Sequence, residues 1–366
     1  MSASPPAPPI GGLRAVAYTI PTDEPESDGT LDWTSTTIVV VHVDAGGCIG
    51  TGYSYTHSSA AALIRSQLAD AIVGRSAMDI ESSYVAMMQR VRNIGRQGLA
   101  ATAISAVDTA LWDLKARLLG IPCISLLGAA RDAIPIYGSG GFTSYTDARL
   151  TEQFTGWIDA GISAVKMKIG RDAADDRRRV HLARTAIGSG QLFVDANGAY
   201  DRKLALGQAD AFARDEVSWF EEPVSSDDLD GLRLIRDRAP AVMDIAAGEY
   251  GYEPQYFKRM LDSGAVDVLQ ADATRCGGPT GFLRAAALCD AAGLPLSSHT
   301  APSIHAHLCC AVPRARHLEY FHDHVRIERL FFDGALEPVR GVLRPDRSRP
   351  GLGITLKQRD AEPFAV

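Results

Sequence analysis

Seven polar side chains recur at nearly regular intervals at the ends of short apolar segments, and this feature most constrains the fold. The intervals between them are 27, 26, 28, 23, 27 and 20 residues, about the length of one strand followed by one helix. The seven residues are Lys168, Asp195, Glu221, Glu249, Asp272, His299 and Glu319. A closed barrel of eight parallel strands would bring all of them to its carboxyl-terminal mouth, where active sites of such barrels lie.

The apolar segments predict parallel strands that are covered by helices. They are nearly continuously apolar and alternate with amphipathic helical stretches, as expected for strands buried on both faces. The eight candidates are 134–139, 164–169, 192–197, 217–222, 243–249, 266–272, 294–300 and 316–321. A doubly wound open sheet is the competing architecture, but no GxGxxG motif follows a strand, because GSGG at 138–141 lacks that spacing.

The chain before residue 131 has a different pattern, which predicts an α+β part. Strand-like segments rich in Val, Ile, Thr and Tyr come first, with a Gly-Gly hairpin signal between the last two. Three stretches with helical spacing of apolar positions follow, and the last ends at Gly120 and Pro122. The expected strands are 11–20, 35–45 and 50–56, and the expected helices are 58–73, 78–94 and 100–119.

Composition limits the classes of partner. With 366 residues, 46% of them hydrophobic, the chain can bury a large core, and its formal charge of -7 comes from interspersed acids and bases. No basic stripe would neutralise a phosphate backbone, which argues against nucleic acid. No apolar stretch reaches the roughly 18 residues of a membrane helix, so we expect a cytoplasmic protein without a membrane partner. Six scattered cysteines predict reduced thiols.

Lys166 and Lys168 lie two residues apart in AVKMKIG, so both side chains point to the same side of a strand, into the barrel. Repulsion between two ammonium groups lowers the pKa of at least one of them, and a neutral amine near pH 7 can act as a base. The pair therefore predicts a catalytic base. The alternative is a structural pair, with one lysine reaching solvent and the other in a salt bridge.

Asp195, Glu221 and Glu249 come from three successive strand ends, which places three carboxylates around one point. Oxygen ligands without Cys or His suit Mg²⁺, which keeps octahedral positions open for substrate and water. The alternative is that the three acids pair with arginines. Asn197 shares the strand face of Asp195 and is a candidate substrate-binding residue, whereas Glu222 points the other way and is expected to be structural.

Asp272 and His299 end adjacent candidate strands, where a carboxylate can fix the tautomer of an imidazole and raise its basicity. Together they predict a second acid or base, while a core histidine bonded to a backbone carbonyl is the alternative for His299 alone. Glu319, if protonated, can donate a hydrogen bond to a substrate carboxylate. Five further histidines are expected to be structural, the last two within reach of the pocket: His305, His307, His317, His322 and His324.

The ordered set of these motifs resembles the enolase superfamily, in its mandelate racemase subgroup, over nearly the whole chain. Each motif is short, but their common order is highly specific. The motifs are Lys166-x-Lys168, VDANG with Asp195, EEP with Glu221, GE with Glu249, DATRCGG with Asp272, SSHTAPSIHAHL with His299 and HLEYF with Glu319.

The resemblance implies an α/β fold, a (β/α)₇β TIM-like barrel with an N-terminal α+β capping domain. It implies a capping domain at 1–130, a barrel at 131–334 and a C-terminal segment at 335–366 that returns to the cap. A symmetric homo-oligomer is implied as well.

The same resemblance implies roles for the site residues. Mg²⁺ and Lys166 would bind the substrate carboxylate, and Glu319 would stabilise the enediolate. Lys168 and the His299–Asp272 dyad would face opposite sides of the α-carbon.

A base on each face of the α-carbon permits two reactions of a small carboxylate substrate. Return of a proton from the opposite face racemises the centre, whereas expulsion of a β-hydroxyl dehydrates the substrate. The segment 20–33 is long and acidic, and a polar lid favours a polyhydroxylated substrate. We therefore expect Mg²⁺-dependent dehydration of an acid sugar, an aldonate or aldarate, to a 2-keto-3-deoxy acid. A racemase or epimerase of a 2-hydroxy acid and a non-catalytic barrel are the alternatives.

Overall fold

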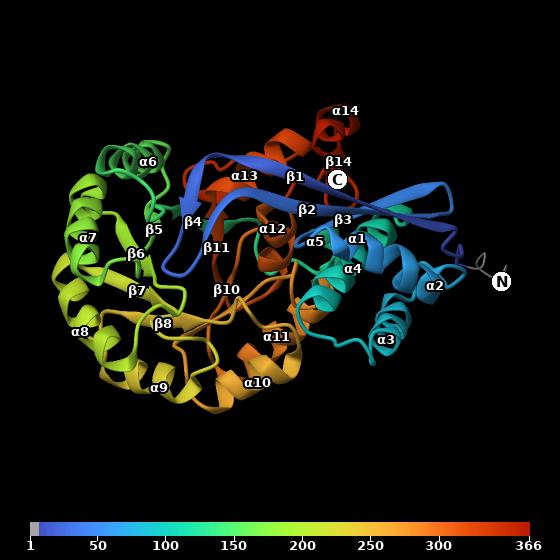
Figure 1. The fold of residues 1–366 in the computed structure, drawn as a ribbon. Coiled ribbons are helices and arrows are strands. Elements are labelled where there is room, and N and C mark those ends of the chain that lie inside the picture. Colours follow the sequence, from blue (N-terminus) through green and yellow to red (C-terminus); the bar gives the residue numbers. More distant parts are fainter. Residues whose placement is uncertain (1–6) are drawn as a thin grey trace.

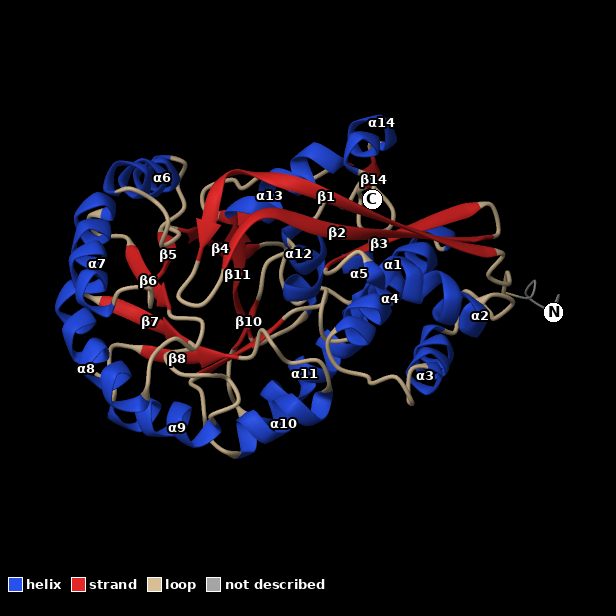
Figure 2. Cartoon of the chain, in the orientation of Figure 1, coloured by secondary structure: helices blue, strands red, loops and turns tan. Residues whose placement is uncertain are grey.

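The computed structural model describes residues 7–366, which form a parallel barrel with a smaller α+β part packed against it (Figure 1). Residues 1–6, which the expected capping domain includes, lie outside the described residues. Helices surround the barrel strands, and a long antiparallel ribbon reaches from the α+β part across the barrel (Figure 2).

The barrel closes through the pairing of its last strand with its first, β11 with β4. Each strand lies within one residue of a segment that the apolar runs predict, and closure shows that the competing open sheet is wrong. The strands are β4 (Ile134–Gly140), β5 (Ala164–Lys168), β6 (Gln191–Asp195), β7 (Val217–Glu221), β8 (Asp244–Ala247), β9 (Val268–Ala271), β10 (Leu296–Ser298) and β11 (Ala315–Phe321). The helices that follow them are α6 (Asp147–Asp159), α7 (Ala173–Ile187), α8 (Arg202–Phe212), α9 (Leu229–Arg238), α10 (Pro254–Asp262), α11 (Gly278–Ala292), α12 (Pro302–Ala311) and α13 (His322–Phe331).

An aromatic layer fills the barrel interior. The ring centroid of Phe193 lies 5.3 Å from that of Tyr137 and 5.5 Å from that of Trp219. The ring of His317 packs 4.8 Å from Tyr137. The Nζ of Lys166 lies 5.6 Å from the centre of the Tyr137 ring. The layer therefore excludes water on this side of Lys166, so the polar strand ends open only toward the mouth.

The α+β part is a three-stranded antiparallel sheet between the barrel and a group of helices. Alternate residues of β2 face opposite ways: Ile38 and Val40 join the core shared with the barrel, whereas Val39 and Val41 pack against the helices. The strands are β1 (Gly12–Ser27), β2 (Asp32–Ala45) and β3 (Cys48–Tyr55). The helices are α1 (Ser59–Leu63), α2 (Ala69–Ile72), α3 (Ile80–Arg90), α4 (Leu99–Leu118) and α5 (Cys123–Leu127), with a π-helical turn at Ile64–Leu68.

The segment 20–33, called the lid below, is a ribbon rather than the loop that the sequence suggested. β1 and β2 continue through it, with Glu26 opposite Trp33 and an irregularity between Pro21 and Glu26. The turn at its tip is closed by Asp28, whose Oδ1 accepts hydrogen bonds from the backbone N–H of Thr30 at 2.6 Å and of Leu31 at 2.8 Å. The ribbon crosses the barrel mouth (Figure 1).

The end of the chain contacts both parts of the molecule. The N–H of Val366 donates to the carbonyl of Ala17 at 3.0 Å, and β12 (Phe332–Asp333) pairs with β14 (Thr355–Leu356). In contrast, β13 (Val342–Leu343) pairs with β4 of the barrel. The last helix is α14 (Gln358–Ala361). Within residues 7–366, no helix combines the length and the apolar character needed to cross a membrane.

Candidate active site

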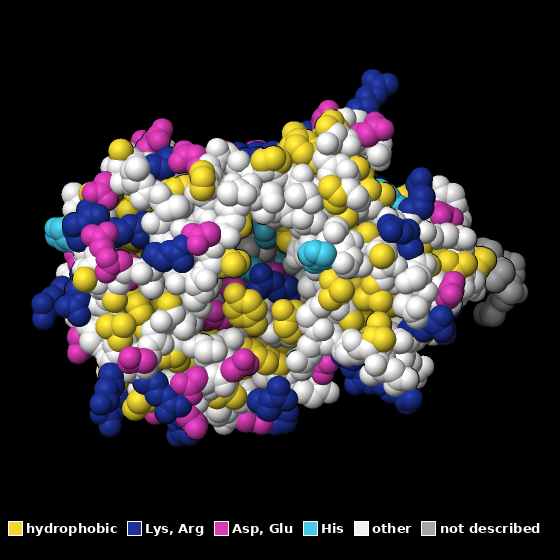
Figure 3. Space-filling view, viewed as in Figure 1, with side chains coloured by type: hydrophobic (Ala, Val, Ile, Leu, Met, Phe, Trp, Pro, Cys, Tyr) yellow, Lys and Arg dark blue, Asp and Glu magenta, His cyan; other side chains and the backbone are white. Residues whose placement is uncertain are grey.

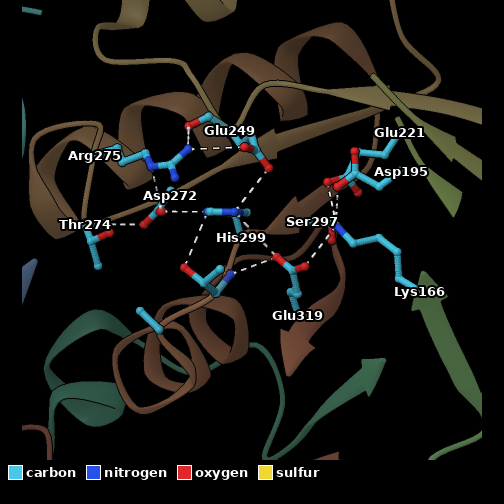
Figure 4. Close-up of polar contacts among 12 residues, drawn as sticks. Lys166, Asp195, Glu221, Glu249, Asp272, Thr274, Arg275, Ser297, His299 and Glu319 are labelled. Carbon is cyan, nitrogen blue, oxygen red and sulfur yellow. Dashed lines mark hydrogen bonds and ion pairs between the residues drawn. The ribbon is translucent and has the colours of Figure 1, made fainter. Parts of the chain in front are cut away.

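All seven residues predicted from the strand-end pattern meet at the carboxyl end of the barrel. Figure 4 labels Asp195, Glu221, Glu249, Asp272, His299 and Glu319 among them. Each lies within two residues of the last residue of its strand: Lys168, Asp195, Glu221, Glu249, Asp272, His299 and Glu319. All are buried. The pattern in the sequence therefore corresponds to one ring of side chains in space.

The turns that leave these strands are held in an uncommon backbone conformation. Asn197 has φ of 46°, Glu222 of 39° and Thr300 of 52°, all in the left-handed region that non-glycine residues seldom adopt. The N–H of Asn197 donates to Oδ1 of Asp195 at 2.9 Å, which closes the turn beside that carboxylate. Such conformations cost about 1–3 kcal/mol each and tend to cluster at functional sites.

Asp195, Glu221 and Glu249 form a compact acidic cluster. One carboxylate oxygen from each lies within 4.8 Å of the others. Three buried hard oxygen donors without sulfur or nitrogen fit Mg²⁺, because it prefers oxygen ligands in an octahedral arrangement. This donor set is therefore able to hold the predicted ion.

The two lysines contact this cluster directly. Lys166 Nζ lies 2.5 Å from Glu221 Oε1, 2.9 Å from Glu319 Oε1 and 3.3 Å from Asp195 Oδ2. Lys168 Nζ lies 2.5 Å from the same Asp195 oxygen. Both ammonium groups are therefore attracted by the carboxylates of this cluster.

The expected lowering of a lysine pKa is wrong for this arrangement. Burial and the charge of Lys166 both lower the pKa of Lys168, but the combined attraction of Asp195, Glu249 and Glu221 outweighs them and the pKa is raised. The spacing of the two lysines predicts the repulsion between their ammonium groups. It does not show the neighbouring carboxylates, which act on the pKa in the opposite direction. A divalent cation held by Asp195 would weaken this attraction and leave burial and repulsion, which favour the neutral amine.

His299 and Asp272 form the predicted dyad. His299 Nδ1 lies 2.7 Å from Asp272 Oδ2, while Nε2 lies 3.1 Å from Glu249 Oε2. Burial lowers the pKa of His299, but the surrounding carboxylates, with Glu249 the strongest, raise it to about 9. With these carboxylates uncompensated, the imidazolium is favoured near neutral pH and donates from both ring nitrogens, so the alternative of a histidine held by a backbone carbonyl is wrong. A cation held by Glu249 would weaken the strongest of these attractions and favour the neutral base.

Glu319 differs from the protonated acid considered from the sequence. Its Oε1 lies 2.9 Å from Lys166 Nζ, and its Oε2 accepts the N–H of Thr300 at 3.1 Å. Burial raises the pKa of this carboxyl, but the combined attraction of Lys166, His299 and Lys168 outweighs burial and the pKa is lowered. The charged carboxylate is therefore the form favoured in this arrangement.

Arg275 is a site residue that the sequence reasoning missed. Its Nη1 lies 3.4 Å from Glu249 Oε1, its Nε lies 3.6 Å from Asp272 Oδ2, and its guanidinium lies 5.1 Å from the centre of the Tyr250 ring. The signal was present in DATRCGG, three residues after Asp272. The alternative that the three acids pair with arginines therefore holds for Glu249. Asp195 instead contacts the two lysines.

A cavity of about 310 Å³ opens between this ring and the lid, and its lining includes Lys168, Asn197, Glu249 and His299. Asn197 Oδ1 is buried and has no hydrogen-bond partner within residues 7–366, so it is available to a ligand. The space-filling view shows the hollow at the barrel mouth (Figure 3). The cavity therefore gives a small molecule access to both candidate bases.

The other histidines divide into structural and cavity-lining groups. His324 lines the cavity, as expected. His322 instead binds the lid, with Nε2 2.9 Å from Asp23 Oδ2. His305 is structural, because its Nε2 accepts the N–H of Ala273 at 2.9 Å and its Nδ1 contacts the carbonyl of Thr300. It joins the turn after Asp272 to the turn after His299.

Two family models match the chain. Residues 21–128 match the mandelate racemase/muconate lactonizing enzyme N-terminal domain, and residues 149–361 match the enolase C-terminal domain-like family. The curated relative L-talarate/galactarate dehydratase of Salmonella typhimurium is 32% identical over 335 residues, which cover 89% of this chain and 82% of the relative.

Solved structures agree with the chain over nearly its whole length. A mandelate racemase/muconate lactonizing enzyme-like protein from Rubrobacter xylanophilus is 52% identical, with a TM-score of 0.96 over 98% of this chain and 100% of that chain. A racemase from Streptomyces coelicolor A3(2) with bound magnesium is 31% identical, with a TM-score of 0.92 over 98% of this chain and 100% of that chain.

Proposed function

The chain belongs to the mandelate racemase/muconate lactonizing enzyme family of the enolase superfamily, and we propose that it dehydrates an acid sugar to a 2-keto-3-deoxy acid. Family membership makes it an enzyme, a lyase or an isomerase. The Salmonella relative is named as a dehydratase of acid sugars, which supports the choice of reaction.

One observation carries the proposal. Lys168 and His299 line the same cavity and contact different members of the acidic cluster, Asp195 and Glu249 respectively. A substrate carboxylate at the cluster would have its α-carbon between the two bases. Removal of an α-proton needs such a base together with fixed charges that stabilise the resulting anion.

The remaining residues have binding and charge-stabilising roles in this proposal. Asp195, Glu221 and Glu249 would hold Mg²⁺, which would supply positive charge that lowers the free energy of the developing anion. Lys166, buried against the cluster, holds one substrate carboxylate oxygen. Asn197, with its free Oδ1, binds a substrate hydroxyl.

The dehydration needs two proton transfers. Lys168 or His299 removes the α-proton, and the electron pair of the broken C–H bond delocalises into the carboxylate. The residue on the opposite face gives a proton to the β-hydroxyl, which leaves as water as the C–O bond breaks. The enol that remains takes up a proton at the β-carbon and releases its hydroxyl proton to solvent, which gives the 2-keto-3-deoxy acid.

Racemisation or epimerisation of a 2-hydroxy acid is the second candidate. The specific observation in its favour is that the cavity wall formed by the lid includes two apolar side chains, Leu31 and Trp33, alongside hydroxyl groups. The Streptomyces structure is also named as a racemase. Both reactions share removal of the α-proton, and they differ in whether a hydroxyl group leaves.

The test is a screen of aldonic and aldaric acids with Mg²⁺ and with EDTA, scored for 2-keto-3-deoxy product and for α-proton exchange in D₂O. We expect a Mg²⁺-dependent product that is lost in Lys168→Ala and in His299→Asn. Exposed Lys203→Ala and His181→Asn are the matched controls. Product at equal rates in EDTA or full activity in both site variants would contradict the mechanism. Exchange without product would favour the racemase.

A further inference from the structure

The positive charges at the cavity are confined to its barrel side. Within residues 7–366, the cationic side chains that line it are Lys168, Arg275 and His299. Each already contacts a carboxylate: Lys168 contacts Asp195 at 2.5 Å, Arg275 contacts Glu249 at 3.4 Å, and His299 contacts Asp272 at 2.7 Å. All three come from barrel strands or from the turns that follow them, so none of them lies at the lid end of the cavity.

The lid side of the cavity carries no positive charge among the described residues. The lining residues on that side are the apolar Leu31 and Trp33, the hydroxyl-bearing Ser35 and Thr36, and one acid, Asp28, whose Oδ1 accepts the N–H groups of Thr30 and Leu31. A ligand that extends from the barrel toward the lid therefore meets hydroxyl groups, apolar surface and one acid.

The other acids of the lid do not face the ligand, so the lid is less acidic toward the cavity than its sequence suggests. Asp23 contacts His322 of α13 at 2.9 Å, and Glu26 is buried, where its Oε2 accepts the indole N–H of Trp33 at 2.7 Å. These contacts hold the lid in place.

The wall formed by the end of β11 and the start of α13 is uncharged as well. His324 stacks on Tyr55 with ring centroids 3.3 Å apart. Burial lowers the pKa of His324 well below its ordinary value, so the ring is neutral near pH 7. Phe321 lies beside it in the lining.

Resting on the proposed function, we infer that the substrate is a monocarboxylic acid sugar, an aldonate, and that the lid side of the cavity selects against aldarates. The single carboxylate of an aldonate would lie at the acidic cluster and Lys166, and its uncharged far end would meet Ser35, Thr36 and the apolar surface. A second carboxylate there would lose water without gaining a counter-charge, and Asp28 would repel it. Talarate and galactarate are dicarboxylates, so the inference separates this chain from the relative named for them.

A neighbouring cavity of about 450 Å³ does not supply the missing charge. It shares Asn197 and Tyr250 with the active-site cavity and is lined by one arginine, Arg259. Two acids, Glu222 and Asp227, line it as well. A far carboxylate that entered this space would face acids as well as the arginine.

The experiment compares matched pairs that differ only at the far carbon: galactonate with galactarate, and gluconate with glucarate. With Mg²⁺ present, we expect kcat/KM to favour the aldonate by ~100-fold, as for a buried charge without a partner. Calorimetric Kd values for the same pairs should show the same order. An aldarate that binds and reacts as well as its aldonate would overturn the inference and leave the proposed dehydration intact. If no acid reacts, the proposed function fails, and the Kd order still decides the charge preference.

A variant at the lid tip tests where the selectivity arises. Leu31 is 60% exposed, so Leu31→Lys is compatible with folding, and Leu31→Gln is the neutral control. The lysine should raise the aldarate-to-aldonate ratio of kcat/KM by ~2–5-fold over the glutamine, as for an exposed ion pair. An equal ratio in the two variants would contradict the assignment of the far end to the lid. A preference for aldarates that Arg259→Met abolishes would instead place the far carboxylate in the neighbouring cavity.

Discussion

Glu26→Gln should stabilise the lid, and increasingly so as the pH rises. The side chain of Glu26 is buried, with 1% exposure, and within residues 7–366 its Oε1 has no hydrogen-bond partner. Burial raises the pKa of this carboxyl, the charges of Asp323 and Asp23 raise it further, and the result is about 9 against an ordinary 4.5. Glutamine retains an oxygen that can accept the indole N–H of Trp33.

The magnitude follows from the difference in protonation between the two states. Between pH 4.5 and about 9 the folded state keeps a proton on Glu26 that the unfolded state releases, so the free energy of unfolding falls as the pH rises. The slope is about 1.4 kcal/mol per pH unit, which amounts to about 4 kcal/mol at pH 7.5 relative to pH 4.5 as an upper estimate. Where lid opening costs less than global unfolding, the loss stops at the free energy of opening.

The assay is urea unfolding at pH 5, 6, 7 and 8, with Trp33 fluorescence and lid hydrogen exchange as local probes. Glu24→Gln is the matched control, because Glu24 lies in the same strand but is exposed and pairs with Arg149 at 3.1 Å. The stability difference between Glu26→Gln and the parent chain should grow with pH, in the global or in the lid probes. Parallel pH curves in both probes would refute the reasoning.

Three further perturbations test the site. Asp272→Asn removes the charge that orients His299, so kcat should fall by ~10–100-fold or more. Exchange of the α-proton at the other base, Lys168, should persist. An unchanged kcat would contradict the dyad. Gly29→Ala places a Cβ 2.7 Å from the carbonyl oxygen of Ile169, so the lid should lift and KM for an acid sugar should rise with little change in Tm. An unchanged KM would mean that the lid tip does not close the site. Glu221→Gln should weaken Mg²⁺ binding by ~10–100-fold in calorimetry, and undiminished affinity would exclude it as a ligand.

The barrel could be predicted because its strands are buried on both faces and therefore have nearly continuous apolar sequences. The lid could not be predicted in the same way. Two prolines, Pro21 and Pro25, and five acids give the segment the composition of a loop, yet it continues as a ribbon. The ribbon depends on tertiary contacts, such as the edge-to-face packing of Trp33 on Phe142 with ring centroids 5.5 Å apart, which no local pattern contains.

The positions of the site residues could be predicted from their regular spacing along the chain, but their pKa values could not. The position of Lys168 at a strand end follows from the period of the barrel, whereas its pKa depends on the 2.5 Å contact with Asp195. The same limit applies to Glu319, whose protonation depends on Lys166, and to Arg275, whose contact with Glu249 depends on a turn. The spacing along the chain predicts which side chains lie near one another. Only the distances between their charged atoms decide which of several opposing charges has the largest effect on a pKa.

The lid is the part of the molecule that can change specificity without disturbing the chemistry. The ring of acids and bases is held by strands and by turns such as the one joined by His305, so substitutions there alter the reaction itself. The lid, in contrast, is attached through Asp23 and His322 at the start of α13, directly after the strand that carries Glu319. Its position is thus fixed relative to the ring, while Leu31 at its tip is exposed and makes no polar contact with the ring. A single charge introduced at the lid tip should therefore change whether a substrate with a charged or an uncharged far end is preferred. Abstraction of the α-proton should remain intact.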